Sequence, residues 1–593
     1  MVGARFQQAG ITCRGGDDHG GIHMKETGAR GLLCAQACRS GLPFALLLSS
    51  VSVSTIALAE DKDTDLRPGN LLVSRAIYDN NPNNVQAGVT QLPPNCIPPG
   101  CVTATDSGSY PSVWNNVLVD SSFGITAKIV LDQLKPSGHL VSSLEVPNSL
   151  QHGVPPTKDQ MVGSFSSKSE VALNLSTDRR FVTFMGYLAA VNAIDVSNSN
   201  TPAVVDPTDP VPGTNFRVVA RVDEDGKFHF TKTNAYSGNN GRAAILNNSN
   251  DRHILYTAGN AGNGADPQPP GVIIGAGAQI MAAETKALAA QDPGLPTPVG
   301  SFSITQLGLA ADKVGKDTNF RGLTIFENVL YYTKGSGGNG INTVYFVDAT
   351  GFDGNGKPLA CPHGVGLPSP LASLPTSPIA YDATVLQTQG VVPYNMCILK
   401  GFPTATKSKT AFPFGIWFAN AKTIYVADEG NGTNTFSTAT GKYTAAASQT
   451  TAGLQKWVFD DSLGAWKMVY VLQAGLDLGV PYTVAGYPTG NNPRTGLPWS
   501  PATDGLRNII GRVNRDGTAT IWAITSTVSG NGDQGADPNK LVMMTDNLTA
   551  TSLPTSESFT TVQAARFAEV LRGVSFTPGT GLAERHEDDH ADH

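Results

Sequence analysis

Short apolar runs alternate with polar turns along most of the chain, and residues 319–340 are the clearest example. An apolar run at Leu323–Phe326 is followed by the polar pair Glu327 and Asn328, and then by a second apolar run at Val329–Tyr332. A loop rich in glycine and asparagine comes next. Two such runs separated by two turn-forming residues predict a β-hairpin that opens into a long loop.

This pattern recurs, and four copies end in the tripeptide Gly-Asn-Gly. The central asparagines are Asn263, Asn339, Asn431 and Asn531. They lie 76, 92 and 100 residues apart, which suits four-stranded blades with inserted loops. The pattern therefore predicts an all-β chain folded as a β-propeller, an architecture whose radial repetition leaves only short sheet edges. The spacing favours six blades, with seven as the alternative.

The two ends of the chain are predicted to pair with each other. Residues 68–79 form one strand, and residues 123–134 and 139–146 form the next hairpin, so this blade lacks an inner strand. Residues 569–579 resemble the start of the hairpin at residue 319. We expect them to supply the missing strand and to close the ring.

The first 59 residues have the features of a leader with a signal peptide. Basic residues precede an apolar run that ends at Ala59, immediately before the acidic Glu60. We expect a mature N-terminus near Glu60 and a secreted or periplasmic protein; a true start at Met24 would leave a signal peptide of ordinary size. The propeller is expected over residues 60–580, without a membrane span, followed by a disordered His- and acid-rich tail at 581–593.

Charge and cysteine content narrow the classes of partner and the compartment. Without residues 1–59 the chain has 36 Lys+Arg and 45 Asp+Glu, a formal net charge of −9, which argues against nucleic-acid binding. Four cysteines remain. An even number in an exported chain predicts disulfides, with Cys96–Cys101 and Cys361–Cys397 as the nearest-neighbour pairing of three possible connectivities.

Four predicted blades carry an arginine at nearly the same position of the repeat, where the chain approaches the innermost strand. These residues are Arg242, Arg321, Arg507 and Arg572. Because guanidinium groups grip carboxylates and phosphates, converging arginines are typical of an anion site at the channel mouth. The alternative is that each arginine pairs with an acid of the neighbouring blade (Glu170, Asp504 or Glu569) and ties the blades together.

The four Gly-Asn-Gly loops also have two interpretations. Glycine and asparagine tolerate positive φ angles, so the tripeptides are expected as simple turns. Alternatively, their asparagine side chains and carbonyls, together with nearby acids, bind Ca²⁺, which takes six to eight oxygen ligands. No catalytic residue is assigned, since the chain has no GxSxG, P-loop, HExxH or dinucleotide-binding motif.

The repeats, the export signal and the charged residues at the channel resemble those of exported six-bladed propellers, a group that includes lactonases, phytase-like proteins and other calcium-dependent esterases. The resemblance covers residues 68–579 at the level of blade pattern. It implies a channel Ca²⁺ held by Asn and acid side chains, here Asn240, Asn319, Asp504 and Glu569, with Glu170 as a further acid. The arginines favour the phytase-like branch.

Two functions follow from the sequence as hypotheses. The first is binding of a small anionic or polyhydroxylated ligand at the channel mouth, with calcium-dependent hydrolysis of an ester or phosphoester as the activity if the protein is an enzyme. The second is a non-catalytic extracytoplasmic protein that binds a partner protein or glycan through its Gly-Asn-Gly loops.

Overall fold

The computed structural model describes most of residues 65–582. The described stretches are 65–78, 81–104 (without 82, 87, 93–95, 97 and 100), 125–147, 160–164, 171–202, 211–260 (without 212, 234 and 250–252), 277–283, 300–301, 319–335, 341–347, 365–375 (without 371) and 396–582 (without 406–409, 493–494 and 532). By its internal contacts the chain separates into two units, Met1–Glu60 and Asp61–His593. The first unit and the tail after residue 582 lie outside the described residues, so the leader and the tail remain predictions.

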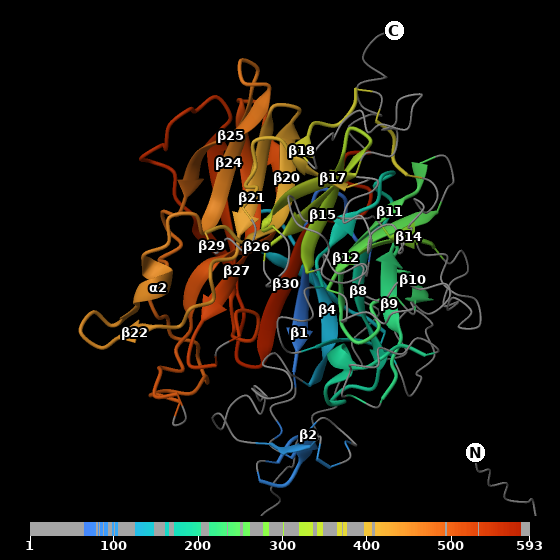
Figure 1. Ribbon diagram of the computed structural model, residues 1–593, viewed down its shortest axis with the longest axis vertical. Helices are drawn as coiled ribbons and strands as arrows, with labels where there is room; N and C mark the ends of the chain where they lie inside the picture. Colours follow the sequence, from blue (N-terminus) through green and yellow to red (C-terminus); the bar gives the residue numbers. More distant parts are fainter. Residues whose placement is uncertain are drawn as a thin grey trace, which may run out of the picture. The chain divides into compact units, whose positions relative to one another are not determined.

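The described residues form mainly β-strands (Figure 1). Their helical elements are the short 3-10 helix η2 (Val196–Asn198) and α2 (Thr444–Ala447). Within the described stretches, none of the helices has the length and apolar character needed to span a bilayer.

Four sheets of four or five strands follow one another along the chain. In order of pairing their strands are β11 (Gly241–Asn247), β12 (Ile254–Gly259), β13 (Ala278–Ala282) and β14 (Gly300–Ser301); β15 (Phe320–Phe326), β16 (Val329–Lys334), β17 (Thr343–Val347), β19 (Met396–Leu399) and β18 (Val365–Gly366); β20 (Pro413–Asn420), β21 (Thr423–Asp428), β24 (Gly453–Asp460) and β25 (Ala465–Leu472); and β26 (Ala502–Val513), β27 (Thr518–Val528), β28 (Lys540–Asn547) and β29 (Thr560–Ala564).

A nine-stranded sheet joins the two ends of the described chain. Its order is β10 (Phe228–Thr233), β9 (Arg217–Val222), β8 (Val182–Ala189), β6 (Gln160–Ser164), β4 (Thr126–Leu134), β1 (Leu71–Ile77) and β30 (Glu569–Phe576), with β5 (Leu140–Glu145) beside β4 and β7 (Asn174–Leu175) beside β8. Two small ribbons pair β2 (Gln91–Leu92) with β3 (Val102–Thr103) and β22 (Phe436–Ser437) with β23 (Lys442–Tyr443).

The predicted pairing of the first and last strands is present. β1 lies between β4 and β30 and is antiparallel to both, with Leu71 opposite Phe576 at one end and Ile77 opposite Glu569 at the other. Figure 1 shows the early strands β1 and β4 beside the late strand β30. Residues about 500 positions apart are thus held in one sheet, as the similarity between residues 569–579 and the hairpin start had indicated.

The hairpin on which the sequence interpretation rests also forms as predicted. β15 and β16 pair directly across the two-residue turn at Glu327 and Asn328. Both turn residues have positive φ angles, 47° and 61°, which match the twist of a tight hairpin.

Six strands lie at a sheet edge and contact one another in a cycle. β7 contacts β11, and contacts then follow to β15, β20, β26, β30 and back to β7. Close approach requires small residues: a Cβ on Gly322 of β15 would lie 2.5 Å from the carbonyl oxygen of Phe414 in β20, and one on Gly415 would lie 2.4 Å from that of Arg507 in β26. The sheets therefore form a propeller-like ring.

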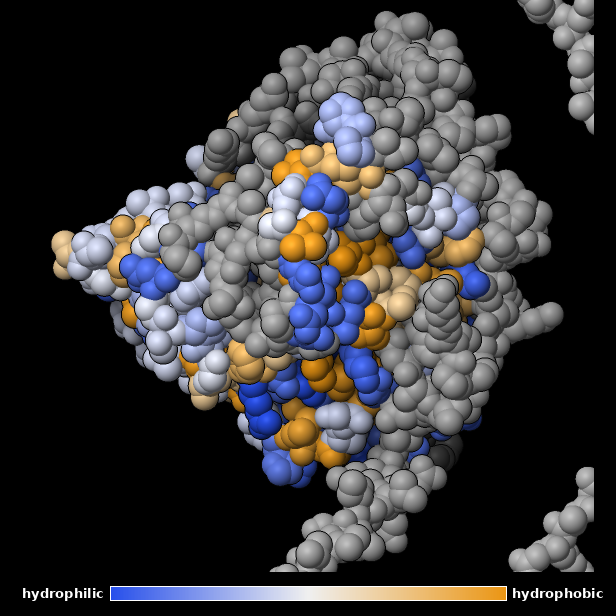
Figure 2. All heavy atoms as spheres, turned by 90° about the horizontal axis from the view of Figure 1, so that it is seen from below, coloured by the Kyte–Doolittle hydropathy of each residue, from blue (hydrophilic) through white to orange (hydrophobic). Residues whose placement is uncertain are grey.

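The apolar core lies between the faces of successive sheets. One large cluster joins the sheets that begin with β11, β15 and β20, and another joins those that begin with β20 and β26. On the face shown in Figure 2, hydrophobic side chains form separate patches among hydrophilic ones. The side chains of the apolar runs are thus mainly buried between neighbouring sheets.

One of the two predicted disulfides lies within the described residues. Cys96 and Cys101 are bonded, with their Cα atoms 5.5 Å apart. Cys397 is buried in β19 and is not a free thiol, but Cys361 lies outside the described residues, so its pairing remains a prediction.

Candidate functional site

All four predicted arginines are buried in edge strands. Arg242 lies in β11, Arg321 in β15, Arg507 in β26 and Arg572 in β30. Their contacts with the protein are of two kinds. Arg321 and Arg507 share a carboxylate, whereas Arg242 and Arg572 bind backbone or amide oxygens.

Arg321 and Arg507 share the carboxylate of Glu429, which follows β21 and is buried. Arg507 donates from Nε and Nη2 to Oε2 at 3.3 and 3.2 Å. Nη2 of Arg321 lies 3.2 Å from Oε1 without hydrogen-bond alignment. Both guanidinium groups also stand over the ring of Phe414 in β20, at 5.6 and 4.9 Å. Glu429 thus ties together three successive sheets.

The other two arginines bind neutral oxygens of neighbouring elements. Arg242 donates to Oδ1 of Asn319 and, at 3.4 Å, to the carbonyl of Phe320 in the next sheet. Arg572 donates to the carbonyls of Gly535 and Ser164 at 2.8 and 3.1 Å. These contacts join neighbouring sheets, but the acceptors are Glu429, Asn319 and backbone carbonyls, while the predicted partners Asp504 and Glu569 bind other groups. A ligand role for the arginines remains a prediction.

The residues predicted to hold Ca²⁺ are engaged differently. Asp504 accepts hydrogen bonds from the backbone N–H of Gly432 (2.8 Å) and from the side chains of Gln449 (2.6 Å) and Gln534 (2.8 Å). Oδ1 of Asn319 accepts from Arg242, and Glu569 pairs with Arg75 at 2.5 Å.

These oxygens accept hydrogen bonds from amide and guanidinium groups of the protein, and a Ca²⁺ role for them remains a prediction. Asn240 is buried with both amide atoms unpartnered, and Glu170 lies outside the described residues. Across the described stretches, no group of three or more His, Cys, Asp or Glu side chains is arranged to hold a metal.

Two of the four Gly-Asn-Gly loops can be described. Asn431 is exposed, its Oδ1 accepts from the N–H of Thr433 at 2.8 Å, and Gly430 and Gly432 have φ angles of 82° and 68°. This geometry is a turn stabilised by its own asparagine. Asn531 is buried, and its N–H donates to Oγ of Ser529 at 2.8 Å. Asn263 and Asn339 lie outside the described residues.

Three buried carboxyl groups, those of Asp428, Asp504 and Asp537, have raised pKa values. Burial is the main cause in each case: it raises the pKa of Asp428 to about 7, helped by the charges of Glu429 and Asp504, and it raises the pKa of Asp504 to about 6. Burial likewise raises the pKa of Asp537 to about 6, although the hydroxyl of Tyr487 opposes this by donating to it. These groups bind protons more tightly in the folded than in the unfolded chain.

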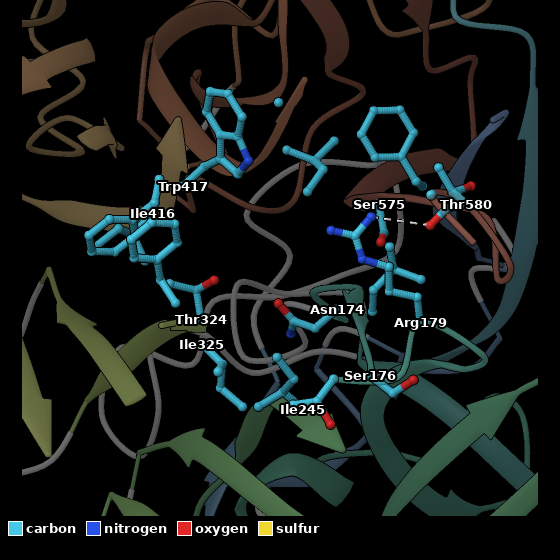
Figure 3. A pocket seen from close by; sticks show the side chains of 18 of the residues that line it. Asn174, Ser176, Arg179, Ile245, Thr324, Ile325, Ile416, Trp417, Ser575 and Thr580 are labelled. Atoms are coloured by element: carbon cyan, nitrogen blue, oxygen red, sulfur yellow. Dashed lines mark hydrogen bonds between the residues drawn. The ribbon is translucent and has the colours of Figure 1, made fainter. Parts of the chain in front are cut away.

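A cavity of about 680 Å³ lies at the C-terminal ends of the six edge strands β7, β11, β15, β20, β26 and β30 (Figure 3). Each of these strands contributes residues from its later part or from the loop after it. The lining residues are Leu173–Thr177 and Arg179, Ile245 and Ser249, Thr324–Asn328, Ile416–Ala419, Ile509–Val513, Ser575, Phe576, Thr580 and Gly581, together with Gly69 and Leu374. A volume of this size accommodates a small ligand. None of the predicted site residues that the structure describes lines it.

The cavity combines an aromatic surface with polar groups that lack protein partners. Oγ of Ser575 has no hydrogen-bond partner although the residue is only 1% exposed. Trp417 is half-buried and stacks on Tyr425 (5.7 Å between ring centroids), and its indole N–H makes no hydrogen bond to a described residue. Asn174 donates to the carbonyl of Ala244 at 3.0 Å, which leaves its Oδ1 available. Figure 3 shows these side chains around one space.

Sequence reasoning missed both Glu429 and the cavity. A signal for Glu429 was present, because this acid immediately precedes a Gly-Asn-Gly loop in the run Asp428–Gly432. The cavity had no comparable signal: Trp417 and Ser575 stand in ordinary strand patterns and come from different blades.

Comparisons with known proteins do not assign a family. No family model matches the chain, and no curated protein matches it. Among solved structures, apo AztD from Citrobacter koseri has a TM-score of 0.25 and 9% identity, covering 77% of this chain and 98% of that one. An ulvan lyase bound to an oligosaccharide has a TM-score of 0.28 and 10% identity, covering 75% and 88%. Likeness at this level carries no argument about the site.

Proposed function

We propose that the six edge strands are the innermost strands of six blades around a central channel. On this proposal the nine-stranded sheet contains two blades, β30–β1–β4–β5 and β7–β8–β9–β10, linked by β6. The cyclic contacts of the edge strands support this count, and the β1–β30 pairing would then close the ring.

We propose that the cavity at the end of these strands binds a small polyhydroxylated ligand such as a sugar. The observation that carries this proposal is the unpartnered hydroxyl of Ser575, buried in a cavity that also presents the indole of Trp417. A buried polar group without a partner is costly. The Oγ atom of Ser575 lies just beneath the cavity wall, and a small opening of that wall would let a ligand hydroxyl satisfy it. The indole N–H of Trp417 and the side chains of Asn174 and Thr324 offer further hydrogen-bonding groups for a sugar.

The proposal is one of binding and names no reaction step. Ester or phosphoester hydrolysis, a channel Ca²⁺ and partner binding through the Gly-Asn-Gly loops remain predictions, and nothing in the proposed binding depends on them. Export also remains a proposal; the Cys96–Cys101 disulfide supports it, since disulfides persist in oxidising compartments.

Replacing Ser575 by Ala should weaken sugar binding without loss of stability. The hydroxyl has no protein partner to lose, so the free energy of unfolding should stay unchanged or rise slightly. A ligand hydrogen bond worth about 0.5 to 1.5 kcal/mol corresponds to a two- to tenfold loss of affinity. A glycan array followed by calorimetric titration of the sugars that bind measures this.

Trp417→Phe is the companion variant, because it keeps an aromatic ring and removes the indole N–H. Its affinity should lie between those of wild type and Trp417→Ala. If Ser575→Ala and Trp417→Ala both bind the same sugars as tightly as wild type, the cavity is not the binding site.

A further inference from the structure

Arg179 has a fixed backbone at the rim of the cavity. It lies in the turn between β7 and β8 with a φ angle of 60°. Its N–H donates to the carbonyl of Ser176 at 2.9 Å, and its carbonyl accepts from the N–H of Gly579 at 2.8 Å. The end of one blade and the segment after β30 therefore hold this residue together.

The guanidinium group of Arg179 lies against the backbone of residues 580–581 and makes few contacts with protein acceptors. Its one hydrogen bond is from Nη1 to the carbonyl of Thr580 at 3.4 Å. A Cβ on Gly581 would lie 1.9 Å from Nη1, so the group rests against bare backbone. Among the described residues it has no carboxylate partner, and a guanidinium has five N–H donors. Figure 3 shows the side chain projecting into the cavity.

The charges that line the cavity favour an anion at this point. They are Arg179, Arg512 and Glu327, all exposed. The guanidinium of Arg512 stands over the ring of Trp522 at 5.9 Å. The acid next to Arg179 in sequence, Asp178, is already bound by Oγ of Ser176 (2.5 Å) and by Nδ2 of Asn248 (2.8 Å). Within the described residues, Arg179 therefore makes no ion pair with Asp178 or with another acid.

We propose that Arg179 selects ligands that carry an oxyanion, and that the ligand of this cavity is an acidic sugar. This inference rests on the proposed sugar binding at the same cavity. A guanidinium pairs with a carboxylate through two parallel N–H···O bonds, and the backbone that carries it is fixed by hydrogen bonds to Ser176 and Gly579.

The test compares acidic sugars with neutral sugars of the same shape. Hexuronates are titrated beside their hexuronamides, and glucose 6-phosphate and glucose 6-sulfate beside glucose, which separates carboxylate from phosphate and sulfate. Wild type should bind the acidic member about tenfold more tightly or better. Arg179→Gln should abolish this preference, because glutamine keeps hydrogen-bonding groups but carries no charge.

Arg180→Gln is the matched control, because Arg180 is an exposed neighbour in the same turn that does not line the cavity. It should keep the preference for acidic sugars. Equal affinity of wild type for acidic and neutral members overturns this inference alone, as does a preference that survives in Arg179→Gln. Failure of every sugar to bind overturns the proposed function and this inference with it.

Discussion

Replacing Glu429 by Gln should lower the free energy of unfolding by about 3 to 5 kcal/mol, because the change leaves two buried guanidinium groups without a counter-charge. Arg321 and Arg507 reach this carboxylate from two different sheets, at 3.2 Å each. Arg321→Ala should cost less, since Arg507 still pairs with Glu429. Denaturant unfolding of the purified variants measures both effects.

Asp461→Asn is the matched control. It removes a carboxylate that pairs with Lys422 at 2.6 Å on the exposed surface. Exposed ion pairs contribute little to stability, so this variant should unfold like wild type. If Glu429→Gln also unfolds like wild type, the shared carboxylate does not stabilise the contact between the sheets. That result would favour the prediction that these arginines bind a ligand.

Stability should fall as the pH rises from about 4 to about 7. Asp428, with a pKa of about 7, and Asp504 and Asp537, with pKa values of about 6, all lie above their ordinary value of 3.8. Between the unfolded and folded pKa values the folded chain binds more protons, so the stabilisation is complete below about pH 4 and is lost as each group ionises. Each unit of pKa shift corresponds to about 1.4 kcal/mol. Thermal unfolding across this range measures the slope.

Asp537→Asn should flatten that slope without disrupting its site. The two oxygens of Asp537 accept from the hydroxyls of Tyr487 (2.5 Å) and Thr527 (3.1 Å), and a hydroxyl can accept from an amide by rotating. Asp516→Asn, in an exposed turn where hydrogen bonds from Thr518 lower the pKa of the acid, is the control and should leave the slope unchanged. An identical slope in wild type and Asp537→Asn would show that this carboxyl is not a source of the pH dependence.

Local patterns predicted much of the fold. The β15–β16 hairpin follows from two apolar runs around Glu327 and Asn328, since the turn geometry depends only on adjacent residues. The β1–β30 pairing followed from the likeness of residues 569–579 to the hairpin start, because repeated units reuse one packing solution. Blade number is harder to predict, because β6 merges two groups of strands into a single sheet.

The site was less predictable because it depends on which strands become neighbours. The arginines could be identified as a recurring feature of the sequence. Glu429, the partner of two of them, belongs to the sheet that begins with β20, and there Phe414 stands in place of an arginine. The cavity gathers Arg179, Trp417 and Ser575 from three distant parts of the chain. No pattern within a window of 20 residues contains that information.

The position of β1 between β4 and β30 has a consequence for incomplete chains. A ribosome supplies residues 569–576 about 500 residues after β1, so until then one side of β1 presents unpaired N–H and C=O groups. An open strand edge is a template for the matching strand of another molecule. A second copy carries that strand as its own β30, so products truncated before Glu569 are expected to recruit full-length chains or to aggregate, and the last blade acts as a checkpoint for complete synthesis.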